Sequence, residues 1–196
     1  MTGQTGTMAT VDDALAPPGS TDAVRDADRL LLWAAAFFTV AVLFHNFDHV
    51  RRGADTLSGD VFAVGTAAIF LEVAVVVLVC QRHRLAPLAA VSAGFALAAG
   101  YVVVHFLPAR SWLSDSFTSA AEVSPLSWAA ASIEVVAALA LGVAGLVALR
   151  SRGGLASAAR AYAGEASLAP GVVHPVALTM AIGNAVILAV SIAQAA

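Results

Sequence analysis

The chain has 196 residues, of which 60% are apolar and only 12% are charged, whereas a soluble globular protein carries about 25% charged residues. The net charge is −3, and the absence of any basic run or basic-aromatic interleaving argues against nucleic acid as a partner. The single Cys80 excludes an intrachain disulfide and a CxxC-type metal site.

Residues 1–28 are polar and rich in Gly, Thr and Asp, with a break at Pro17-Pro18. They lack the basic start and the short apolar core of a cleaved signal peptide. This composition predicts a disordered cytoplasmic tail. The first hydrophobic segment, residues 30–50, is then a retained signal-anchor.

Uncharged hydrophobic segments follow one another through the rest of the chain. Each is close to the ~20 residues that cross a hydrocarbon core of about 30 Å, and only helices satisfy their own backbone in lipid at this length. We therefore expect an all-α, multi-pass protein of the cell (plasma) membrane, with one domain over residues 29–196. Its five predicted transmembrane helices span residues 30–50, 61–80, 87–107, 126–149 and 173–194.

The arginines predict the orientation of these helices. Seven of them fall in the tail and in the loops after helices 2 and 4, and three fall on the other side. The positive-inside rule then places the N-terminus in the cytoplasm and the C-terminus outside. The loop 108–125 is also outside, and its stretch 111–117 is interpreted as a short amphipathic helix along the membrane surface.

Ionisable side chains within the predicted helices are the candidate functional residues, since each costs about 2.5–3.5 kcal/mol in the hydrocarbon. Three histidines and two acids from helices 1, 3 and 4 fall in the outer half of the membrane. At 1.5 Å per residue, Glu134 lies roughly 12 Å and Glu72 roughly 18 Å below the outer surface. The full set is His45, Asp48, His49, Glu72, His105 and Glu134.

Small residues share helix faces with these polar groups, and such stripes mark close helix contacts in membranes. The predicted packing faces are Ala130, Glu134, Ala138 and Gly142 on helix 4; Gly65, Ala68 and Glu72 on helix 2; and Gly94, Ala98, Tyr101 and His105 on helix 3.

The segment His45-Asn46-Phe47-Asp48-His49 predicts a metal site. Histidines four residues apart stand one above the other on a helix and can bind one ion. Asp48 lies on the same side, and His105 supplies a third imidazole from another helix. Three histidines with a carboxylate suit Zn²⁺, or Fe or Cu at a nitrogen and oxygen site.

Glu72 and Glu134 are the candidate catalytic residues of an enzyme acting on a lipid-soluble substrate. Glu134 is also a possible carboxylate ligand. In this interpretation Glu72 orients one of the metal-binding side chains or accepts a proton.

Other interpretations stay open. Haem b needs one axial histidine from each of two facing helices, and His45 or His49 with His105 meets that condition. A metal-free cluster would serve a proton-linked carrier, or would only fix helix packing in an accessory subunit of a larger membrane complex or a homo-oligomer. The adjacent Arg51 and Arg52 bind lipid headgroups, attract an anionic ligand or neutralise Asp48.

Overall fold

The structure is a computed structural model that describes residues 20–53, 56–108, 112–156 and 159. These residues form helices and no strand. The elements are α1 (Ser20–Arg52), α2 (Gly59–Cys80), α3 (Ala86–Tyr101), a π-helical turn η3 (Val102–Phe106) and α4 (Pro125–Ser151). The predicted tail before residue 20 and the predicted fifth helix, 173–194, lie outside the described residues.

Four helices are long and apolar enough to cross a membrane, with α3 and η3 counted as one span. Large apolar side chains remain exposed along them, including Trp33, Val40, Phe47 and Phe70. Apolar exposure on this scale is typical of helices that face lipid rather than water.

The observed bounds of α2, α3 with η3, and α4 lie within two residues of the predicted segments, whereas α1 begins ten residues earlier than predicted. The added turns are polar. Asp22 and Arg25 approach to 3.8 Å, and Asp26 and Arg29 to 3.7 Å, as i,i+3 pairs. Such pairs stabilise a helix in water, so the helix continues beyond the apolar run.

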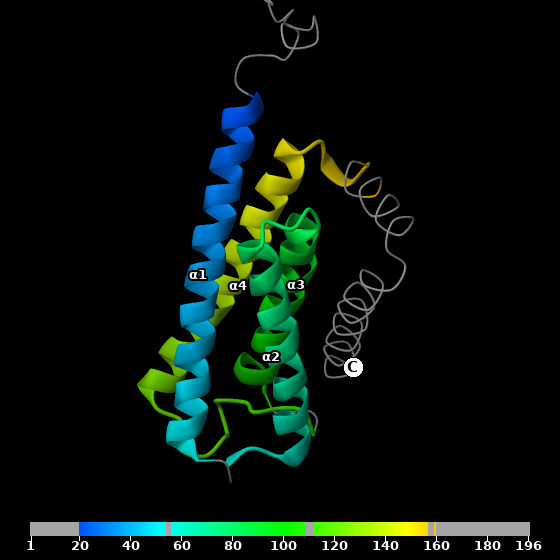
Figure 1. Ribbon diagram of the computed structural model, residues 1–196. Helices are drawn as coiled ribbons and strands as arrows, with labels where there is room; N and C mark the ends of the chain where they lie inside the picture. The colour runs from blue at the N-terminus through cyan, green and yellow to red at the C-terminus, as the bar shows by residue number, and fades with distance from the viewer. Residues whose placement is uncertain (1–19, 54–55, 109–111, 157–158, 160–196) are drawn as a thin grey trace, which may run out of the picture.

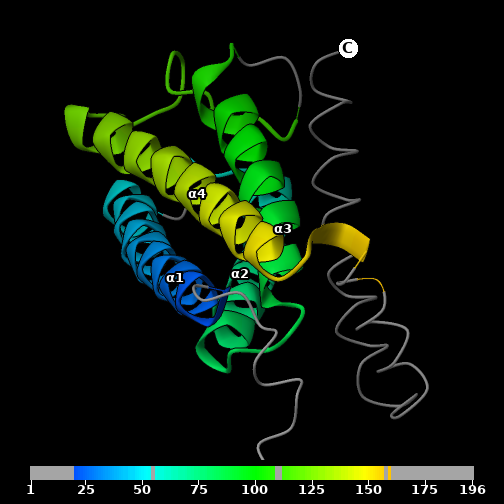
Figure 2. The same ribbon diagram turned by 90° about the horizontal axis from the view of Figure 1, so that it is seen from above.

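The helices alternate in direction along the chain (Figure 1). One end of the bundle therefore gathers the end of α1, the start of α2, η3 and the start of α4; we call it the site end. Seen from above, α4 lies between α1 and α3 and packs against both (Figure 2). Because α2 contacts its neighbours less extensively, it leaves space on its inner side.

Small residues allow α3 and α4 to approach closely. A Cβ added at Gly94 would lie 2.5 Å from the backbone nitrogen of Gly142, and one at Gly145 would lie 2.8 Å from the carbonyl of Pro87. The predicted packing stripe on α4 is buried. The stripe predicted on α2 is wrong at Gly65, which is exposed and has nothing within 4 Å of an added Cβ.

The loop before α4 differs from its predicted form. The segment expected to form an amphipathic surface helix is irregular from residue 112 to 117, and Leu113, Asp115 and Phe117 are buried against the site end. The N–H of Phe117 donates to the carbonyl of His105 at 2.9 Å. Carbonyls at a helix end lack intrahelical partners, so this bond fixes the loop to η3.

Candidate metal centre

The last turns of α1 carry two histidines on one face. His45 and His49 are four residues apart, so their rings stand one above the other. Their Nε2 atoms are 2.8 Å apart, and the ring centroids are 4.5 Å apart. His45 is buried and His49 is half-buried. Both rings therefore present a nitrogen to the same small volume.

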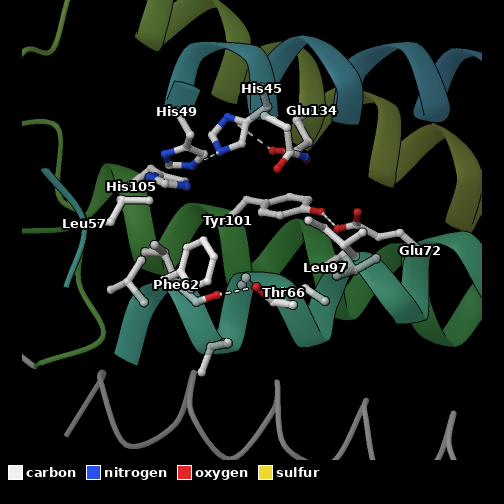
Figure 3. Close-up of a pocket in the computed structure, with 18 of the residues that line it drawn as sticks. His45, His49, Leu57, Phe62, Thr66, Glu72, Leu97, Tyr101, His105 and Glu134 are labelled. Atoms are coloured by element: carbon white, nitrogen blue, oxygen red, sulfur yellow. Dashed lines mark hydrogen bonds and ion pairs between the residues drawn. The ribbon is translucent and has the colours of Figure 1, made fainter. Parts of the chain in front are cut away.

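His105 reaches that volume from η3. The turn is wider than an α-helix, with the N–H of Leu107 donating to the carbonyl of Val102 at 3.3 Å, and such turns are frequent at functional sites. The centroid of the His105 ring lies 4.8 Å from that of His45 and 5.7 Å from that of His49. One ligand atom from each histidine lies within 4.8 Å of the others, so the three could hold a metal ion (Figure 3).

Carboxylates lie behind two of these rings. Glu134 Oε2 of α4 is 3.4 Å from His45 Nδ1, and Asp115 Oδ2 of the loop is 3.5 Å from His105 Nδ1. The backbone carbonyl of Asp115 is 3.3 Å from the same His105 nitrogen. Metal-binding histidines commonly donate their second N–H to a carboxylate or carbonyl, which fixes the tautomer and the ring orientation. The arrangement leaves Nε2 of His45 and His105 available to an ion.

A buried ion pair holds the loop carboxylate. Arg52 donates to both oxygens of Asp115, at 2.6 and 2.8 Å, and both side chains are almost fully buried. The Arg52 guanidinium also lies 5.4 Å from the centroid of the Phe117 ring. A bidentate pair of this kind fixes both direction and distance. The end of α1 thus holds the carboxylate that in turn faces His105.

Asp48 forms an ion pair with Arg51, three residues along α1. Its Oδ1 accepts from Arg51 Nε at 2.8 Å, and the same guanidinium donates to Ser124 and Ser127 hydroxyls at 3.1 Å. Of the roles predicted for the arginine pair, neutralising Asp48 is the one that Arg51 performs. Asp48 therefore ties α1 to the start of α4, and it is absent from the histidine group found among the described residues.

Deeper in the bundle, Tyr101 of α3 joins the two remaining acids. Its hydroxyl donates to Glu72 Oε1, and Glu134 is the other acid beside that hydroxyl. The Tyr101 ring lies 6.3 Å from the His45 ring. Within the described part of the chain, Oε2 of Glu72 and Oε2 of Glu134 are buried without a hydrogen-bond partner. Glu134 thus has an unpaired oxygen next to His45, and Glu72 has one at the other end of the Tyr101 side chain (Figure 3).

A cavity of about 450 Å³ adjoins this cluster, between α1, α2 and η3 (Figure 3). One wall is polar and contains the histidines, Tyr101 and both glutamates. The facing wall consists mainly of apolar side chains of α2, among them Val61, Phe62 and Ile69.

Asp115 was not among the predicted site residues, and its pairing with Arg52 was not predicted. Asp115 falls in the loop that the sequence assigned to the membrane surface, where depth along a helix carries no information. The available signal was the Arg51-Arg52 pair, which is unusual on the side that carries few basic residues.

No protein-family model, curated protein or solved structure matches the chain.

Proposed function

We propose that this chain is a membrane metalloprotein in which His45, His49 and His105 bind one ion of Zn, Fe or Cu. The observation that carries the proposal is the pairing of ligands with backing groups: three imidazole nitrogens lie within 4.8 Å, and two of the rings have a buried carboxylate behind them. Imidazole suits each of these metals, and three histidines with an open fourth position form a known catalytic zinc site.

The distances fit a single ion after small adjustments of the rings. With bonds of 2.0–2.1 Å, nitrogens around a tetrahedral zinc ion lie about 3.3 Å apart. The two Nε2 atoms on α1 are 2.8 Å apart, and no pair in the group exceeds 4.8 Å. Rotation of the half-buried His49 and a small shift of His105 would bring all three to bonding distance.

The same distances favour a bare ion over haem. Two axial histidines must approach a porphyrin from opposite faces, with the macrocycle between them. Here the rings of His45 and His105 are in contact, with centroids 4.8 Å apart. That contact leaves no space for a macrocycle between the two rings.

The cavity supports an enzymatic role on a lipid-soluble substrate. Its volume falls within the 300–1,000 Å³ range of small-molecule sites. The three histidines line the cavity together with Glu134 and Glu72, so an ion bound by them would be accessible from the cavity. In this role Glu134 orients His45, and Glu72 with Tyr101 accepts or delivers a proton at the substrate.

Metal analysis of the detergent-purified full chain tests the proposal. We expect about one equivalent of Zn, Fe or Cu per chain, lost in the His49→Ala and His105→Ala variants. His49→Gln is a milder variant, because His49 is only half-buried and glutamine keeps a polar side chain of similar length. His83→Ala is the matched control, since His83 lies in the turn between α2 and α3 at the opposite end of the bundle.

The metal content distinguishes a metalloprotein from a non-catalytic subunit in which the polar residues only fix helix packing. Stoichiometric metal that depends on the cluster and not on His83 supports a metal centre. A wild-type protein that takes up no metal after dialysis against each ion, and whose variants are only less stable, would overturn it and would favour a non-catalytic packing role.

A further inference from the structure

The cavity beside the candidate metal centre has two chemically different walls. Apolar side chains of α2 form one wall, including Val61 and Phe62. The other wall contains polar groups of α1, α3, η3 and α4, together with Glu72 of α2. Asymmetric walls of this kind accept a molecule with a long apolar part and one small polar end. The volume of about 450 Å³ is enough for a small molecule and not for a membrane phospholipid with two chains.

The cavity reaches the lipid-facing side of the molecule. Val50 of α1 and Phe62 of α2 both line it, and they are 78% and 63% exposed. Gly65 lines it too and is exposed, with open space where a side chain would stand. These residues belong to helices that are long and apolar enough to cross a membrane. An apolar molecule can therefore enter from the bilayer between α1 and α2 without crossing water.

The polar wall has acceptors in excess of donors. Tyr101 uses its one proton on Glu72 Oε1. Within the described residues, Glu72 Oε2 has no hydrogen-bond partner, although the side chain is only 4% exposed. A buried polar atom of this kind is unfavourable unless a partner arrives. An occupant that brings a donor to Glu72 would satisfy it.

We infer that the cavity binds a lipid-soluble molecule with a single hydroxyl group, an apolar alcohol or phenol, whose hydroxyl donates to Glu72. A hydroxyl is the small donor that crosses hydrocarbon without carrying a charge, whereas an ammonium group pays a large desolvation penalty on that route. The molecule would occupy the same cavity that the three histidines line. The inference names the substrate class of that centre and in this sense rests on the proposed function, but binding itself needs only the cavity and Glu72.

Binding of radiolabelled 4-octylphenol to the full chain in phosphatidylcholine nanodiscs tests the inference, with empty nanodiscs as background. We expect one saturable site per chain. Octylbenzene has the same chain and ring without the hydroxyl. It should compete at least about tenfold more weakly, because the hydrogen bond to Glu72 is lost and its buried oxygen stays unsatisfied. Equal competition by octylbenzene would overturn the role of the hydroxyl, and tighter binding of octylamine would overturn the choice of a neutral donor.

Variants then locate the site. Gly65→Phe should abolish binding by obstructing the cavity, because Gly65 lines the cavity and has open space where the ring would stand. Ala67→Phe on the same helix is the matched control, because Ala67 is exposed and does not line the cavity. Glu72→Leu should weaken octylphenol about tenfold and leave octylbenzene unchanged. Full binding by Gly65→Phe would overturn the placement of the ligand.

Metal content separates this inference from the proposed function. Each variant is assayed for metal in parallel, and retained metal shows that the bundle is folded. Octylphenol binding to metal-free wild-type protein would leave the cavity assignment intact even if no metal centre exists. A metal-loaded protein that binds no octylphenol would overturn the cavity assignment alone.

Discussion

Replacing Glu134 by glutamine should weaken metal binding without disturbing the fold. Within the described residues, the Oε2 atom of Glu134 faces His45 Nδ1 at 3.4 Å, and neither atom has a hydrogen-bond partner. Glutamine fills nearly the same volume but removes the charge that holds the ring. Because Glu134 is 1% exposed, water cannot readily compensate for the lost charge.

The structure sets the size of this effect. Loss of a group that orients a metal-binding histidine typically costs 10- to 100-fold in affinity. The 3.4 Å contact is longer than the 2.7–2.9 Å of a strong charge-assisted hydrogen bond. We therefore expect the lower part of the range, about 10- to 30-fold, or about 1.4–2.0 kcal/mol.

Competition against a chromophoric chelator at fixed pH measures the dissociation constant for Zn²⁺, and the absorption spectrum of the Co²⁺-substituted protein reports ligand geometry. Glu122→Gln is the control, since Glu122 is an exposed acid of the loop before α4. A dissociation constant within twofold of wild type, with an unchanged Co²⁺ spectrum, would refute the reasoning that Glu134 acts on the metal through His45.

Three further outcomes follow from the packing and the topology. Gly94→Ala should lower the thermal unfolding midpoint, since its Cβ would lie 2.5 Å from the α4 backbone and such overpacking costs about 1–3 kcal/mol, whereas Gly65→Ala should not. Asp115→Asn leaves the buried Arg52 without its counter-charge and should destabilise the protein by about 3–5 kcal/mol in the same assay, with much of the loss recovered in an Arg52→Met/Asp115→Leu double variant. Cys80, the single cysteine, is exposed at the end of α2, so a membrane-impermeant maleimide should label it only after permeabilisation of cells; labelling of intact cells would reverse the predicted orientation.

The helix spans could be predicted closely because hydrocarbon thickness fixes their length. The start of α1 could not, since hydropathy measures apolar runs and the first turns are held by exposed Asp–Arg pairs. The fixed span length also explains why His45, His105 and Glu134 gather at one end of the bundle. Depth along helices of alternating direction is enough to bring them together, without any knowledge of helix packing.

Depth along a helix could not predict which partner each polar side chain contacts. Depth alone places Asp48 near the histidines, but the direction of its side chain is set by Arg51, three residues along the same helix. Asp115 follows no helical periodicity, and its position depends on a long-range pair with Arg52. The π-helical turn that carries His105 also has no distinct sequence signal in this chain.

Charge balance connects these observations to the proposed ion. At the site end, Arg51 and Arg52 neutralise Asp48 and Asp115. Glu72 and Glu134 have no such cation: among the described residues their neighbours are Tyr101, the histidines and each other. Two buried carboxyl groups without a counter-charge are unfavourable in a membrane bundle. A divalent ion on the three histidines would supply that charge next to Glu134. The ion that gives the histidines a function would therefore also stabilise the buried carboxyl groups.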